Sequence, residues 1–153
     1  MGAFLAMEAI KDSVLTGQFD TADRLNSIIL ASPDIDIDLF RAQLEQIEGS
    51  VDRIAVLLSE DDSALRISRG IDGGVPRVGA SDLEQLADLG VVAIDLSVVD
   101  DSPSGSHSKF AGSPEIVQLI GRCLDQNQRF DRYQRGKRLD KITAGIPITV
   151  AFG

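Results

Sequence analysis

Carboxylate and imidazole side chains gather in three short segments of this sequence, and they set the chemistry that the chain could perform. Asp34, Asp36 and Asp38 occupy alternate positions, and Asp62 closes an acidic run further along. The chain's one histidine, His107, follows in a serine- and glycine-rich stretch. A histidine can take a proton from a hydroxyl nucleophile, and a carboxylate can fix the tautomer of that histidine. An acid followed by a histidine is therefore a candidate pair for general base catalysis.

The same side chains also have simpler interpretations. Aspartates at alternate positions could bind a divalent cation or supply an aspartyl nucleophile, but the lysine and hydroxyl partners of such a site are not evident. Asp36 or Asp38 could instead cap a helix that carries Phe40 and Leu44. A lone histidine such as His107 in a Gly/Ser loop is more often a surface residue. We predict no metal site and no cofactor.

Three apolar runs of strand length separate these segments. They cover residues 27–31, 53–59 and 91–96, and each run is continuous, as in parallel strands covered on both faces. Helical patterns lie before, between and after these runs. The first covers residues 2–16, with Phe4, Met7, Ile10, Val14 and Leu15. Later ones carry Phe40, Leu44 and Ile47, then Leu65 and Ile67, then the residues after a Ser81–Glu84 capping box, and finally, after Ser113 and Pro114, Ile116, Val117, Ile120, Cys123 and Leu124.

Strands that alternate with helices predict βαβ crossovers and an α/β fold with an open parallel sheet. The carboxyl ends of parallel strands meet at one edge, where ligands gather. Three strands make a small sheet, because such domains usually carry about five or more. The apolar helix at residue 2 also begins without a capping residue before it. The sequence therefore predicts part of an α/β domain over residues 1–126.

The segment at residues 127–153 has a different character. It carries six basic residues against two acidic ones, and an apolar stretch follows at residues 146–152. Charged, unpatterned termini are usually mobile. We expect a basic, mobile tail, which could alternatively dock a partner or an acidic surface.

Composition narrows the functional classes. The chain has 153 residues, with 24 acidic against 15 basic residues and a formal net charge of −9. This charge argues against a protein that holds nucleic acid or anionic lipid through a general positive field. The single cysteine, Cys123, cannot form an intramolecular disulfide, which favours a reducing compartment. With no leader pattern and no apolar run near the roughly 18 residues of a span, we expect a soluble, cytoplasmic protein.

The order of the candidate residues matches a known arrangement. An acid after one strand and a histidine after the next are the later two members of the Ser…Asp…His order of α/β-hydrolases. The sequence has no G-x-S-x-G. Four stretches nevertheless resemble, in order, a poorly characterised bacterial family of α/β-hydrolases, from about residue 1 to 125: residues 1–9, 28–36, 58–65 and 106–110.

This resemblance implies a partial site. The family's nucleophile elbow has the sequence His-Ser-Met-Gly, and its last two residues are similar to Met1-Gly2, so the nucleophilic serine would precede Met1. Asp62 would be the triad acid, His107 the base, and the Met1 amide an oxyanion-hole donor. Asp36 is a second-choice acid, because some α/β-hydrolases carry it one strand earlier.

Two functions follow from the missing serine. The chain is expected to be the C-terminal portion of an esterase- or lipase-like hydrolase, inactive as written, which meets an ester or amide substrate only when the other half is supplied. The alternative is a non-catalytic interaction module that binds a partner through an exposed sheet edge and the basic tail.

Overall fold

The computed structural model describes residues 1–22, 25, 27–58, 77–97, 114–125 and 148–152. In this described part of the chain, four strands form one sheet in the order β1-β2-β3-β4, and the first three are parallel. Their bounds are β1 (Ile28–Ala31), β2 (Ile54–Leu58), β3 (Val92–Asp95) and β4 (Thr149–Phe152). The expected α/β fold and its three parallel strands are confirmed.

The fourth strand was not expected. β4 pairs antiparallel with β3, with Phe152 opposite Val92 and Thr149 opposite Asp95. These four residues belong to the segment expected to be a mobile tail, and they form a strand because Thr, Val and Phe favour extended structure and β3 offers them an edge. Residues 126–147, which include all the basic residues of that segment, lie outside the described part of the chain.

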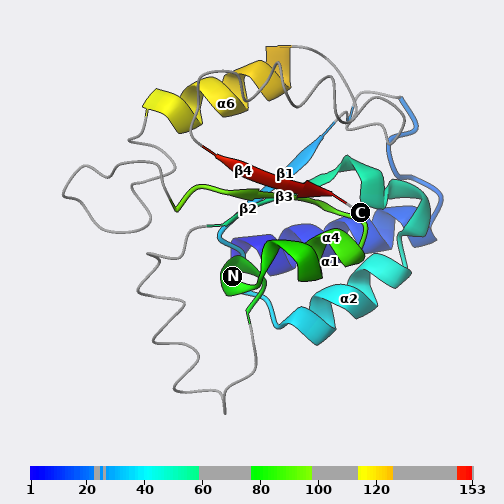
Figure 1. The fold of residues 1–153 in the computed structure, drawn as a ribbon. Helices are drawn as coiled ribbons and strands as arrows, with labels where there is room; N and C mark the ends of the chain where they lie inside the picture. Colours follow the sequence, from blue (N-terminus) through cyan, green and yellow to red (C-terminus); the bar gives the residue numbers. More distant parts are fainter. Residues whose placement is uncertain (23–24, 26, 59–76, 98–113, 126–147, 153) are drawn as a thin grey trace.

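Helices cover the sheet on both faces (Figure 1). One face carries α1 (Gly2–Leu15), α2 (Ile37–Glu45) and α4 (Leu83–Asp88), with the short 3-10 helices η1 (Glu48–Arg53) and η2 (Val78–Ala80). The opposite face carries α6 (Pro114–Asp125). Ile54, Val56 and Leu58 of β2 join the core beneath α1 and α2, while Ala55 and Leu57 join the core beneath α6. Burial on both faces explains why this strand is a continuous apolar run.

The core-facing stripe of α1 differs from the expected one. Met7 is fully buried, and Ala3, Ile10 and Val14 pack against the same core. Phe4 and Leu15, which the sequence placed on this face, are 36% and 65% exposed. In α6, Ile116 is buried as expected and Val117 is exposed. The side chain of Cys123 and the predicted helix around residues 65–67 lie outside the described set.

The N-caps of α2 and α4 test two predictions made from the sequence. Asp36 caps α2, and its carboxylate accepts hydrogen bonds from the amides of Asp38 at 2.8 Å and Leu39 at 3.1 Å. The predicted capping box at Ser81 is wrong. Asp82 is the N-cap of α4, and the Ser81 hydroxyl donates instead to the Arg77 carbonyl at 2.9 Å, closing η2.

Arg53 anchors the connection between α1 and the sheet. Its guanidinium donates to the Asp20 carboxylate at 2.6 Å and to the Leu25 carbonyl at 2.9 Å, and it lies over the Phe19 ring at 5.3 Å. Both charged side chains are largely buried, Asp20 with only 4% exposed. Because Arg53 directly precedes β2, this cluster holds the end of α1 at the amino edge of the sheet.

We predict that Arg53→Ala lowers the free energy of unfolding by about 3 kcal/mol, because it leaves the buried Asp20 carboxylate without its cation. The matched control is Arg41→Ala, which breaks an exposed pair with Asp38 and should cost less than about 1 kcal/mol. Urea unfolding of both variants tests this. Equal losses would contradict the anchoring role of Arg53.

A second polar contact joins α1 to α2. The Glu8 carboxylate accepts from Lys11 at 2.5 Å and from the buried Gln43 amide at 2.7 Å. These two hydrogen bonds hold the pKa of Glu8 below its ordinary value, and the one from Lys11 has the larger effect.

The lowered pKa of Glu8 means that its contribution to stability is present above the ordinary glutamate pKa and is lost as the pH falls through the lowered value. Glu8→Gln should therefore flatten the acid limb of stability against pH. Thermal unfolding between neutral pH and about pH 3 measures this limb, and an unchanged slope would contradict the assignment.

Candidate functional site

The carboxyl ends of β1, β2 and β3 lie next to one another. The amide of Ser32, directly after β1, donates to the Leu57 carbonyl at 2.9 Å. The amide of Leu96, directly after β3, donates to the Leu58 carbonyl at 3.0 Å. Leu58 is also the register partner of Asp95. The chain therefore leaves the three strands at adjacent points of one edge, where ligands of parallel sheets gather.

The first turn of α1 lies at the same edge. The end of α1 is fixed at the amino edge by the Arg53 cluster, and a helix of 14 residues is about 21 Å long. A strand of β2's length spans about 17 Å. The N-terminus therefore reaches the carboxyl edge, on the left of the view (Figure 1). Met1 is the N-cap, with no side-chain cap and no acidic residue in the first turn.

The two principal predicted site residues, Asp62 and His107, lie outside the described residues. Asp62 comes four residues after Leu58, and His107 comes twelve residues after Asp95. Their segments thus start from register partners on neighbouring parallel strands. The positions of their side chains stay a prediction.

The aspartates after β1 have structural partners. Asp36 is occupied as the cap of α2, Asp34 lies 3.6 Å from the Arg77 guanidinium, and Asp38 pairs with Arg41 at 2.9 Å. Within the described ranges, no three His, Cys, Asp or Glu side chains form a group that could hold a metal ion. The first-strand aspartates are therefore explained by local structure.

Ser32 is a feature that sequence reasoning missed. Its φ is +39°, in the left-handed region that residues other than glycine rarely adopt, and its side chain is buried with 7% exposed. Its hydroxyl has no hydrogen-bond partner among the residues that the structure describes. Strain and an unsatisfied polar group thus coincide at the carboxyl edge, where functional residues often store them. No local pattern in Ala-Ser-Pro signals this.

Ser32 is nevertheless a poor nucleophile candidate. In a nucleophile elbow the residue after the serine supplies a backbone N–H to the oxyanion hole. That residue is Pro33, which has no N–H. Ser32 is therefore better placed to line the site than to attack a substrate.

Asp95 closes the end of β3 with a local turn. One carboxylate oxygen accepts from the Ser97 amide at 2.8 Å and from the Ser97 hydroxyl at 2.5 Å. This turn fixes the backbone at residues 95–97, directly after β3. The sequence places Asp95 inside an apolar run and gives no sign of this role.

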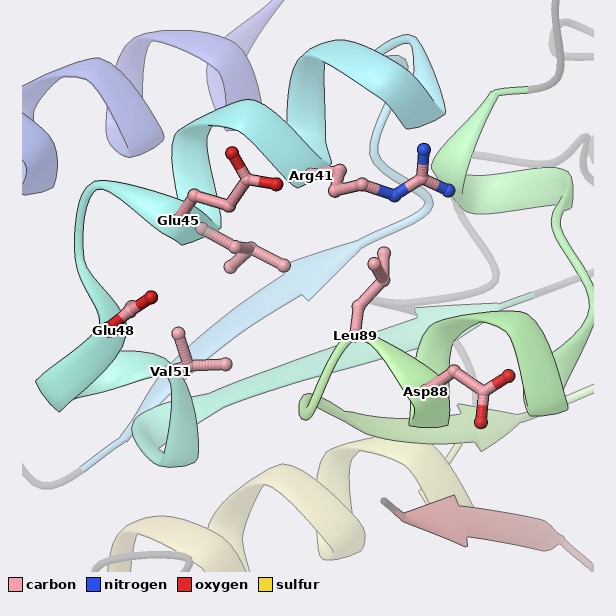
Figure 2. Close-up of a pocket in the computed structure, with 7 residues that line it drawn as sticks. Arg41, Glu45, Glu48, Val51, Asp88 and Leu89 are labelled. Atoms are coloured by element: carbon pink, nitrogen blue, oxygen red, sulfur yellow. The ribbon is translucent and has the colours of Figure 1, made fainter.

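A groove on the described surface lies elsewhere. Figure 2 shows it between α2, η1 and the end of α4, with the lining residues Arg41, Leu44, Glu45, Glu48, Val51, Asp88 and Leu89. Because η1 and α4 lead into the starts of β2 and β3, the groove lies toward the amino edge of the sheet. It is separate from the carboxyl edge, where β1, β2 and β3 end.

Comparison with known families gives one result. Residues 1–123 match the family described as alpha/beta hydrolase of unknown function (DUF900). Neither the curated proteins nor the solved structures gave a match. Within the described ranges, no helix is long and apolar enough to cross a membrane.

We predict that Ser32→Ala leaves the free energy of unfolding unchanged or raises it by about 1 kcal/mol, because it removes a buried hydroxyl that has no partner within the described ranges. Ser81→Ala is the matched control. It removes a hydroxyl that donates to a carbonyl, and it should lower stability by about 1 kcal/mol. Chemical denaturation compares the two, and a loss at Ser32 as large as that at Ser81 would contradict the assignment.

Proposed function

Because the chain belongs to the alpha/beta hydrolase family of unknown function (DUF900), we propose that it is the C-terminal portion of a serine hydrolase, esterase- or lipase-like. Its substrate class is a small molecule with an ester or amide bond. The proposal gives Asp62 and His107 the roles of triad acid and base, and it takes the nucleophile from a serine directly before Met1.

One observation carries this proposal. β2 and β3 are parallel neighbours, and the last residue of β2, Leu58, is the register partner of Asp95 at the end of β3. A segment with a candidate acid therefore starts beside a segment with the one histidine, in the chain order acid then base. The first turn of α1 shares this edge, which supports a serine immediately before it.

The proposed roles follow from the chemistry of the groups. His107 takes the proton of the serine hydroxyl as it attacks the carbonyl carbon, and Asp62 holds the imidazole in the required tautomer. The Met1 amide, at the uncapped start of α1, donates a hydrogen bond to the oxyanion. Asp36 is the weaker choice of acid, because its carboxylate already accepts two amides of α2.

The chain as given has no serine in the nucleophile position. Loss of the nucleophile costs on the order of 10⁶ in turnover. The 153-residue chain should therefore be inactive alone. The alternative function, a non-catalytic interaction module with a free sheet edge and a basic tail, predicts no catalysis from a longer chain either.

We predict that a fluorophosphonate probe labels no serine of the 153-residue chain and labels the serine before Met1 in a chain extended upstream in the same reading frame. His107→Gln should abolish the labelling of the extended chain, because the serine then lacks its base. Asp36→Asn, which removes the charge of the second-choice acid but keeps a side chain that can cap α2, is the control and should retain the labelling. Intact-mass spectrometry of the labelled proteins provides the readout.

Two results would contradict the proposal. One is a labelled serine in the 153-residue chain. The other is an extended chain that carries a serine before Met1 and folds, but that the probe does not label; this outcome favours the interaction module.

A further inference from the structure

Residues 77–79 are tied to the turn that follows β1. The Val78 amide donates to the Ile35 carbonyl at 2.8 Å, and the Gly79 amide donates to the Pro33 carbonyl at 2.9 Å. The side chains of Val78 and Ile35 are both buried in the core under α1 and α2. This backbone tie therefore fixes the start of η2 at the carboxyl edge of the sheet.

The side chain of Arg77 adds an ion pair to this backbone tie. The backbone of Arg77 forms an antiparallel bridge with that of Asp36. The Arg77 guanidinium lies 3.6 Å from the Asp34 carboxylate, and the Arg77 side chain is only 17% exposed. Solvent screens a largely buried charge less than an exposed pair such as Arg41 and Asp38. The ion pair therefore reinforces the tie.

The tie gives the segment that carries Asp62 a second anchor. The chain leaves the carboxyl edge at Leu58, the last residue of β2, whose carbonyl accepts the Leu96 amide at 3.0 Å. The chain is again fixed at this edge at Arg77. Asp62, the proposed triad acid, lies between these two anchors, four residues after Leu58. A segment anchored at both ends has fewer conformations open to it than one anchored at a single end.

A triad acid depends on such anchoring. The carboxylate that orients an imidazole must stay within hydrogen-bond distance of it. A misplacement of about 1 Å in an active site can cost about 100-fold in rate. The turn after β1 can supply support in place of a catalytic group, because Asp36 already caps α2 and Asp34 faces Arg77.

We propose that Arg77, paired with Asp34, is a positioning residue for the triad acid. It fixes the far end of the segment that carries Asp62 and so holds the Asp62 carboxylate against the His107 imidazole. The inference rests on the proposed function, which assigns Asp62 and His107 as acid and base. It adds that the turn after β1 supports this acid without touching the substrate.

The single histidine of the chain provides the readout. The imidazole of His107 titrates as one group in NMR spectra of the 153-residue chain. A carboxylate beside an imidazole favours the charged form and raises the pH at which the ring titrates. Asp62→Asn should therefore lower the titration midpoint of His107 by about 1 pH unit. Arg77→Gln should lower it by at least about 0.5 pH unit, because the carboxylate is then held less closely.

The sign of the Arg77 effect separates positioning from a direct charge effect. Loss of a nearby cation, acting on the imidazole through space, favours the imidazolium and raises the midpoint. Loss of positioning lowers it. Arg77→Lys keeps a cation for Asp34 and should restore most of the original midpoint. Arg41→Gln, which breaks the exposed pair with Asp38, is the matched control and should leave the midpoint unchanged.

Asp34→Asn provides a second test if Arg77→Gln does not fold. It breaks the same ion pair from a side chain that is 49% exposed, and it should also lower the midpoint of His107. In the Asp62→Asn background this lowering should disappear, because the ion pair acts through Asp62. A lowering that persists there is a direct effect of the Asp34 charge and contradicts the proposal.

Two results overturn different claims. A midpoint that Asp62→Asn leaves unchanged overturns the acid and base assignment of the proposed function, and the positioning role falls with it. A midpoint that Asp62→Asn lowers, but that Arg77→Gln raises or leaves unchanged, overturns only the positioning role of Arg77.

Discussion

Burial of β2 on both faces is the constraint on which the rest of the structure depends. Its side chains alternate between a core under α1 and α2 and a core under α6, and all five residues are buried. The backbone amides and carbonyls of a strand so placed need hydrogen-bond partners on both sides, and the parallel strands β1 and β3 supply them. Three carboxyl ends then meet at one edge. The candidate site is a consequence of this packing.

The polar contacts position the covering elements around that sheet. Arg53 holds the connection after α1 at the amino edge, which sends the first turn of α1 to the opposite edge. Asp36 starts α2 immediately after the turn at Ser32. The charged groups at the end of β1 thus serve the fold, and the chemistry proposed for this edge falls to the segments that follow β2 and β3.

Sequence patterns predicted the parallel strands well because each is a continuous apolar run. They missed β4, whose partner β3 lies far away along the chain and whose four residues follow a charged segment. They also predicted Ser81 as the N-cap of α4, where the structure has Asp82, because moving the helix start by one residue leaves its apolar pattern unchanged. The strain and burial of Ser32 depend on the contacts of β1 with β2, which no local pattern carries. For the candidate site, the order of strands and acidic residues along the chain indicated that the carboxyl edge of the sheet is the place to look. Only the strand register of the structure showed that the ends of β1, β2 and β3 are adjacent.

The mass and N-terminal sequence of the polypeptide isolated from its native source test the central claim most directly. A C-terminal portion of a serine hydrolase predicts a protein heavier than 16.4 kDa, with a serine immediately before the residue numbered Met1. A native mass of 16.4 kDa with Met1 at the terminus would contradict the claim, because the acid and base proposed at Asp62 and His107 would then have no serine nucleophile.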